Sequence, residues 1–267
     1  MNFVKNGFLV ENPLDVTKTI ENKYPEIISI YLEANQLAWS VQYEVRLPKD
    51  EVVKLHIGTL FCRILNFTQS CYILATRGMS VQASSQYRCS LDPLFQMVAL
   101  INDRTFWSEL EKWELKGQRN ALNGYLNSYT GSKSNDGYKR IKAREQDLKR
   151  NLLKLFPDNE ALRNFQIKTE DVARKAGMLH WYNTMYRIGS ADSHSDFKSL
   201  ESHLVLDSEG GIAHLINEPI ENGFDTIVSF VCQILLCATE RFTQYNELNK
   251  QAQLTQLSDR LEKALGE

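Results

Sequence analysis

Hydrophobic residues recur at every third or fourth position along most of the chain, which is the spacing of an amphipathic α-helix. This pattern predicts a series of helices. They cover residues 14–45, 50–76, 80–102, 105–127, 138–156 and 169–187, and a last long helix follows Pro219. The second helix carries apolar residues over much of its circumference, so we expect it to lie at the centre of the fold.

Single residues indicate where these helices begin, end or bend. Pro25 is expected at a helix start or at a kink in the first segment. Asp50 is expected to cap the second helix, and Gly78 is expected to end it. Pro93 is expected to interrupt the third helix, and Thr169 to cap the sixth.

One segment departs from the helical pattern. Residues 203–217 hold two short apolar runs around Gly210 and Gly211, which predicts a β-hairpin or an extended flap. The polar stretch 127–137 predicts a loop, and it is the only weak domain boundary. The tail is either a docked end helix or a partner-binding arm, because four leucines keep a helical spacing there. These are Leu254, Leu257, Leu261 and Leu265.

Together the elements predict one all-α domain, a multi-helix bundle with a small β-hairpin before the last long helix. Residues 1–48 would form an N-terminal helical extension, 50–246 the core bundle, and 247–267 a polar C-terminal helix or tail. The chain has 267 residues, which is ample for a sizeable core. It contains no internal repeat, no Gly-rich phosphate loop and no zinc-ligand spacing.

The composition narrows the class of protein. A net charge of −2 argues against a nucleic-acid coat driven by charge alone, although a local basic face is compatible with it. The five cysteines include no Cys-x-x-Cys pair, so we expect buried, reduced thiols and a cytoplasmic protein. No apolar run approaches the roughly 20 residues needed to cross a bilayer, and we expect no membrane partner.

An arginine and a histidine seven residues apart, Arg187 and His194, are the leading candidates for chemistry. A helix that continued through Gly189 would place both on one face, about 10 Å apart along its axis. A break at Gly189 is favoured, with Ser190 or Asp192 capping a new helix that begins near Ser193 and has His194 at its N-terminus. Both side chains would then face the same turn, beside free backbone N–H groups.

A guanidinium and an imidazole around one pocket suit a phosphodiester. Arg187 would hold the non-bridging oxygens and stabilise added charge in the transition state. His194 would transfer a proton near neutral pH. RNA supplies its own nucleophile, the 2′-hydroxyl, so this chemistry needs neither a metal nor a cofactor.

The spacing of Arg187 and His194 on a late helix of an all-helical domain resembles the Arg-x(4–6)-His motif of the HEPN superfamily. The resemblance implies a metal-independent endoribonuclease of a toxin–antitoxin or anti-phage system. It also implies a homodimer with both motifs in one cleft, and an antitoxin or another defence-system protein as partner. Ile188 stands where many members of that superfamily have a polar residue. In this site Tyr186, Ser190 and Asp192 would orient the pair, and Arg88 or Asp92 would brace it from a neighbouring helix.

Two stretches are similar to a bacterial family of uncharacterised all-helical proteins, and the similarity covers about residues 50–246. They read "YRCSLDPLFQMVALINDRTFW" and "HWYNTMYRIGSADSHSDFKSLESHLV". The matching positions are Arg88, Asp92, Tyr186, Arg187, Ser190 and His194. This resemblance implies a glycine hairpin before the last helix and carries no activity.

Other interpretations of the same residues stay open. Arg187 could pair with Asp92 and join two helices, with His194 as a hydrogen-bonded turn residue. Asp192, His194 and Asp196 could hold a metal, with His203 as a further ligand. The rival function is a non-catalytic helical sensor or scaffold that binds an anionic ligand or a protein partner.

Residues 138–154 form the one marked positive stretch, with seven basic and two acidic residues. One interpretation is an RNA-binding face that follows the phosphate backbone. Its residues would be Lys139, Arg140, Lys142 and Arg144. The other is a solvated helix face with mixed ion pairs.

Overall fold

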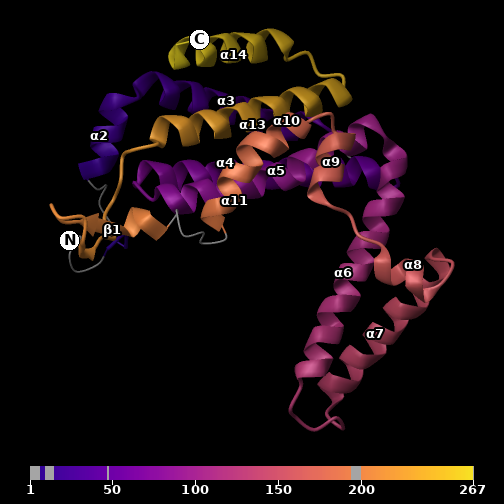
Figure 1. Cartoon of the computed structure of the whole chain (residues 1–267). Coiled ribbons are helices and arrows are strands. Elements are labelled where there is room, and N and C mark those ends of the chain that lie inside the picture. Colours follow the sequence, from indigo (N-terminus) through magenta and orange to yellow (C-terminus); the bar gives the residue numbers. More distant parts are fainter. Residues whose placement is uncertain (1–6, 10–14, 47, 194–199, 267) are drawn as a thin grey trace. The chain divides into compact units, whose positions relative to one another are not determined.

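The computed structural model describes residues 7–9, 15–46, 48–193 and 200–266, without the side chains of 191–193 and 202 (Figure 1). The chain divides into two compact units. Unit 1 comprises Met1–Asn102 and Ala173–Glu267, and unit 2 comprises Asp103–Val172. The sequence prediction of one domain did not include this division, and the weak boundary predicted at 127–137 lies inside unit 2.

The fold class is all-α with one small hairpin, as predicted. Unit 1 contains α2 (Asp15–Lys23), α3 (Pro25–Glu44), α4 (Val52–Thr76), α5 (Ser80–Asn102), α10 (Leu179–Trp181), the π-helix η2 (Tyr182–Tyr186), α11 (Arg187–Ser193), η3 (Glu201–His203), β1 (Leu204–Leu206), β2 (Ile212–Leu215), α13 (Phe224–Tyr245) and α14 (Gln251–Leu265). Unit 2 contains η1 (Arg104–Phe106), α6 (Trp107–Ser128), α7 (Asp136–Leu155) and α8 (Asn159–Asn164). Helix α9 (Thr169–Lys175) begins in unit 2 and ends in unit 1.

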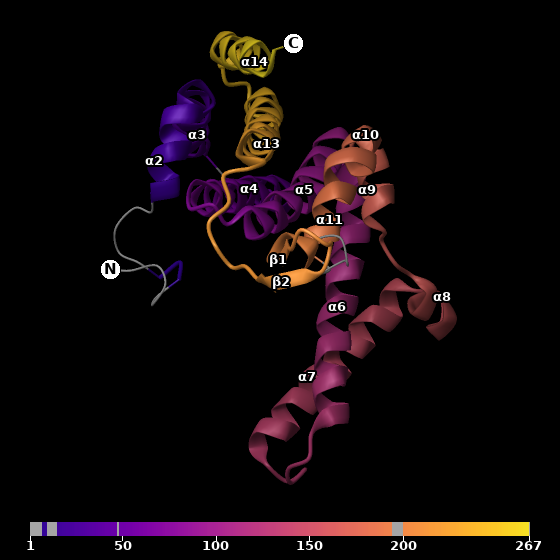
Figure 2. The same ribbon diagram turned by 60° about the vertical axis from the view of Figure 1, so that its left-hand side comes forward.

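The core of unit 1 is built around α4, α5 and α13. Helices α4 and α5 lie side by side, and α13 packs on both of them and on α3. Figure 2 shows α13 between α14 and the α4–α5 pair. Phe61 of α4 and Phe242 of α13 stack with ring centroids 4.2 Å apart. The prediction that the second helix, α4, lies at the centre of the fold is therefore confirmed. Helix α13 lies at the centre beside it.

By length and composition alone, helix α13 could cross a membrane. In unit 1, however, 67% of that apolar window is buried against other helices. Its inward stripe includes Val228, Val231 and Leu235, all fully buried. This is the pattern that the core helix of a soluble protein shows.

The helix boundaries follow the predicted signals in part. Pro25 opens α3, where its missing N–H costs nothing. Gly78 ends α4 at φ +74°, with its N–H bonded to the Ala75 carbonyl at 2.9 Å. The predicted Asp50 cap is wrong, because the N-cap of α4 is Glu51 and no side chain caps it.

Two predicted helices differ from the structure. Helix α5 runs unbroken through Pro93, so the predicted interruption is wrong. A proline withholds one N–H bond but the remaining ladder continues, and burial of Pro93 against the core offsets the loss. The predicted helix over 169–187 is instead broken at Gly177, which has φ +71°. The N–H of the next residue, Met178, bonds back to the Ala173 carbonyl at 2.8 Å and ends α9.

The hairpin and the tail resolve two open alternatives. Strands β1 and β2 pair antiparallel, with Leu204 opposite Leu215. The Asp207 carboxylate accepts the N–H groups of Glu209 and Gly211 and so holds the turn. Helix α14 is a docked end helix, because it packs on α3 and α13. Its buried residues are Leu254, Leu257 and Leu261.

Candidate functional site

Helix α11 continues through Gly189 to Ser193, so the predicted break at Gly189 is wrong. A Cβ built on Gly189 would lie 2.7 Å from the Cβ of Arg88 and 2.9 Å from the Tyr87 ring. The glycine is therefore needed for the close approach of α11 to α5, and it does not end a helix. Ser190 caps no new helix, because its hydroxyl donates to the Tyr186 carbonyl one turn back at 2.7 Å.

The contact between α5 and η2 is built around the guanidinium of Arg88. Its Nη1 bonds to Oδ2 of Asp92 at 3.0 Å, and its Nη2 donates to the hydroxyl of Tyr186. The guanidinium carbon also lies 4.5 Å from the centroid of the Tyr186 ring. Partial burial alone would lower the pKa of Arg88, but the charge interactions with Asp92 and Tyr186 and the hydrogen bond to Cys89 outweigh it and raise that pKa.

Tyr186 is the last residue of the π-helical turn η2, a geometry that is rare and often found at functional sites. Its ring stacks on Tyr182 at 5.0 Å and lies 6.2 Å from Phe95 of α5. The Nε atom of Arg88 is buried and has no hydrogen-bond partner among the described residues. Three of the predicted supporting residues, Arg88, Asp92 and Tyr186, thus come together in one cluster.

Arg187 follows this cluster by one residue and is exposed. Among the residues that the structure describes, Arg187 forms no ion pair, and Asp92 is bonded to Arg88 within α5. The predicted partner of Arg187, His194, lies outside the described residues, and so do Asp196 and the side chain of Asp192. The cluster therefore presents one arginine to solvent beside another that is held by its neighbours.

The described part of the chain contains no group of three or more His, Cys, Asp and Glu residues that could hold a metal. His203, proposed above as a further ligand, has its Nδ1 3.2 Å from the Ile216 carbonyl and so belongs to the hairpin. The metal interpretation otherwise depends on Asp192, His194 and Asp196. The structure does not describe the side chains of these three residues.

The predicted RNA-binding residues lie on α7 of unit 2. All four side chains, Lys139, Arg140, Lys142 and Arg144, are exposed. Lys139 pairs with Asp136 at 3.6 Å, while the other three form no ion pair with any residue in the described ranges. Unit 2 as a whole has 14 Lys and Arg against 11 Asp and Glu, a net charge of +3, which leaves unit 1 with −5.

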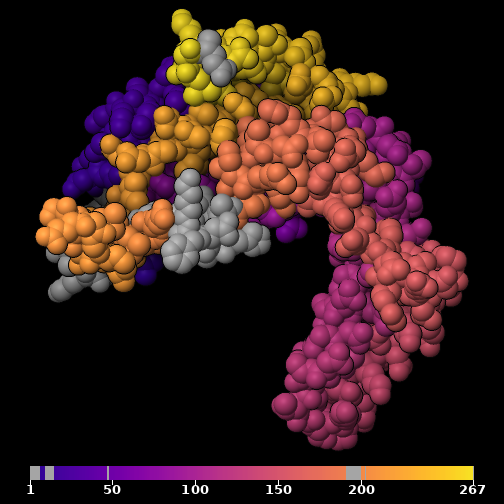
Figure 3. Space-filling model, in the orientation of Figure 1, coloured from indigo at the N-terminus to yellow at the C-terminus, as the bar shows by residue number. Residues whose placement is uncertain are grey.

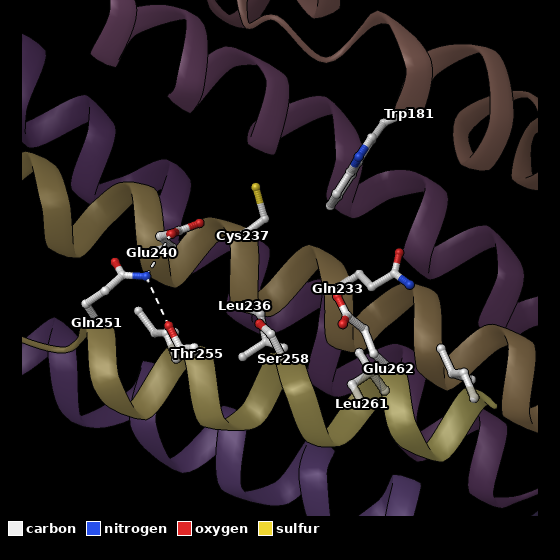
Figure 4. A pocket seen from close by; sticks show the side chains of 12 residues that line it. Trp181, Gln233, Leu236, Cys237, Glu240, Gln251, Thr255, Ser258, Leu261 and Glu262 are labelled. Carbon is white, nitrogen blue, oxygen red and sulfur yellow. Dashed lines mark hydrogen bonds between the residues drawn. The ribbon is translucent and has the colours of Figure 1, made fainter. Parts of the chain in front are cut away.

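Sequence reasoning missed a groove of about 470 Å³ between α13 and α14 (Figure 4). Figure 3 shows the segment around α10, which supplies Trp181 to this groove, beside α13 and α14. Gln251 donates to Glu240 at 3.3 Å across it. Burial raises the pKa of the Cys237 thiol to about 11, which disfavours the reactive thiolate at neutral pH. No local motif marks this groove, because its lining comes from three separate stretches of chain.

Comparison with known proteins gives one match. No curated protein and no solved structure matches the chain. The sequence pattern of a protein family matches residues 54–212, which include the Arg88 cluster, Arg187 and the whole of unit 2. Since the match covers more than half of the chain, the protein belongs to this family of unknown function, DUF5677.

Proposed function

We propose that the protein is a metal-independent endoribonuclease that cleaves RNA by attack of the 2′-hydroxyl. The observation that supports this best is Arg187, an exposed guanidinium without an ion pair among the described residues. It directly follows Tyr186, whose ring and hydroxyl are held by Arg88. A cation without an acidic partner keeps its hydrogen-bond donors available for phosphate oxygens.

In this reaction the 2′-oxygen forms a bond to phosphorus and the 5′-oxygen leaves. The 2′-hydroxyl loses its proton and the leaving oxygen gains one. His194 would carry out proton transfer, because an imidazole titrates near neutral pH. Arg187 would bind the non-bridging oxygens and stabilise the negative charge that develops on them. Arg88, Asp92 and Tyr186 act as positioning residues, since they fix the start of α11 against α5.

The HEPN resemblance extends the proposal to the biological setting. The enzyme acts in the cytoplasm as a homodimer, because one arginine and one histidine make a sparse site and two facing pairs make a cleft. It belongs to a toxin–antitoxin or anti-phage system, and its partner is an antitoxin or another defence-system protein. Sedimentation of the purified chain tests the dimer directly.

The activity is tested with purified full-length protein and single-stranded RNA in EDTA. The wild type is expected to cut. Arg187→Ala and His194→Ala are expected to abolish cutting while their circular dichroism matches the wild type. Arg63→Ala removes an exposed arginine of α4 and serves as the matched control that still cuts.

Two outcomes contradict the proposal. If EDTA stops the cleavage, a metal is required and the interpretation built on Asp192 and Asp196 takes its place. If the wild type leaves every RNA intact, the chain is better described as a non-catalytic sensor or scaffold that binds an anionic ligand or a protein partner.

A further inference from the structure

Unit 2 contains a hollow of about 640 Å³ between α6, α7 and α8 that is rich in hydrogen-bond donors. Four of the side chains around it are cationic, two carry amides, and no carboxylate lines it. The polar residues are Lys116, Arg119, Asn120, Lys149, Asn159 and Arg163. A concave surface with several cations and no acidic lining residue favours an anion.

Arg119 is the most firmly held of these cations. Its Nε donates to Oε1 of Glu145 at 2.8 Å, and the two side chains are only 19% and 11% exposed. The carboxylate bonds only to Nε, which leaves the end edge of the planar guanidinium, formed by the two Nη atoms. Neither Nη atom has a hydrogen bond to any described residue. That edge is the geometry with which an arginine grips two oxygens of one phosphate.

The other cations differ in how firmly hydrogen bonds hold their side chains in place. Nζ of Lys116 donates to the carbonyls of Arg163 and Phe165 at the end of α8, which fixes its ammonium beside the hollow. Lys149 and Arg163 are exposed, and neither forms an ion pair within the part of the chain that is described. Two cations held by hydrogen bonds and two exposed cations therefore surround the same space.

We propose that this hollow is a phosphate site, and that it takes a phosphate group of an RNA backbone. The choice of RNA as the source of the phosphate rests on the proposed function. The inference that the hollow binds a phosphate group does not depend on that function. The net charge of +3 on unit 2, against −5 on unit 1, supports RNA because it concentrates attraction for a polyanion on the unit that holds the hollow. The exposed cations of α7, among them Arg140 and Arg144, belong to the same unit.

Binding is measured by fluorescence anisotropy with a labelled 12-nucleotide RNA whose 2′-hydroxyls are methylated, so that cleavage cannot interfere. The test variant is the double substitution Lys149→Ala/Arg163→Ala, which changes only exposed side chains. The control is Lys133→Ala/Lys168→Ala, which removes the same charge from exposed positions of unit 2 that neither line the hollow nor belong to the basic stretch 138–154.

The test variant is expected to lose at least about tenfold in affinity, and its salt slope should fall by about 0.7, because contact with one phosphate is lost. The control is expected to lose less than about threefold, because it weakens only the general field. Equal losses of RNA affinity in both variants, or no loss in either, would overturn the proposal of a phosphate site.

A second arm identifies the source of the phosphate. Inorganic pyrophosphate is titrated against the protein–RNA complex. If millimolar pyrophosphate is needed for displacement, RNA is the ligand of the site. If micromolar pyrophosphate displaces RNA from the wild type and not from the test variant, the phosphate site holds and its ligand is a free polyphosphate. Cleavage of unmodified RNA is measured separately at saturating RNA, so a failure of the nuclease leaves this binding result unchanged.

Discussion

Gly189 of α11 lies directly against Arg88 of α5, so that a Cβ on the glycine would come within 2.7 Å of the arginine's own Cβ. This contact brings Tyr186 within hydrogen-bond reach of the Arg88 guanidinium. It also determines where Arg187 leaves the packed surface, because consecutive helical residues differ by about 100° around the axis.

Gly189→Ala is expected to destabilise unit 1 by roughly 1–3 kcal/mol, because the added methyl collides with α5. In an open helix the same change stabilises by up to about 1 kcal/mol. Gly117→Ala, on α6, is the control, since nothing lies within 4 Å of a Cβ there. Thermal unfolding followed by circular dichroism measures both. An unchanged or higher melting temperature for Gly189→Ala would show that α11 does not pack on α5 as described.

Tyr186→Phe keeps the ring over Arg88 and removes only the hydroxyl that accepts from it. A lost hydrogen bond to a charged group is worth about 1.5–3 kcal/mol, and the partial exposure of Arg88 places the expected loss near the lower end. Urea unfolding measures it. Tyr43→Phe on α3 is the control and should be neutral, because that side chain is 73% exposed. Equal stability of the two variants would argue that the Arg88–Tyr186 bond contributes nothing.

Stability is expected to fall as the pH rises above about 9. Burial raises the pKa of the Cys232 thiol to about 12 and that of Cys237 to about 11, and it also raises the pKa of Tyr31. Between pH 9 and 11 the unfolded chain loses thiol protons that the folded chain keeps, so the free energy of unfolding decreases through that range. Urea unfolding at several pH values under reducing conditions measures the slope. Cys237→Ala should make it shallower, and a slope identical to wild type would contradict the buried thiol.

Helix α14 is expected to depend on its leucines far more than on its ion pairs. Leu261 is buried, so Leu261→Ala should weaken local docking by about 2–4 kcal/mol. Arg260 pairs with Glu26 at 3.0 Å and Glu33 at 2.7 Å, but the two carboxylates are about half exposed. Arg260→Ala should therefore change stability by less than about 1 kcal/mol. Hydrogen exchange in α14 is the measurement. Faster exchange in Arg260→Ala than in Leu261→Ala would reverse this ranking.

The spacing of apolar residues predicted most of the long helices, the hairpin and the all-α class. Single residues predicted helix boundaries correctly where the boundary depends only on the backbone of that residue and its neighbours. Pro25 opens a helix because it lacks only an N–H that would be unpaired, and Gly78 ends one because it adopts positive φ. The spacing of Leu254 and Leu257 predicted the apolar face of α14, but it did not predict the surface on which this face packs.

The role of Gly189 could not be predicted in this way. A glycine that ends a helix and a glycine that admits a neighbouring helix look the same in sequence. Only the second role depends on Tyr87 and Arg88, about 100 positions away in the chain. The predicted interruption at Pro93 is wrong for a similar reason, because Pro93 is buried in the core and α5 continues through it. The alternative in which Arg187 pairs with Asp92 is not what the structure shows, because Asp92 bonds to Arg88 on its own helix.

The sequence by itself determined most of the helical segments and their apolar faces, because backbone preference and the periodicity of burial depend on residues only a few positions apart. The tertiary structure alone decided that Arg88 meets Tyr186, that Arg119 meets Glu145 in a separate unit, and that Arg187 is exposed. Such pairs depend on which helix faces come together, and that choice is made by packing over the whole unit.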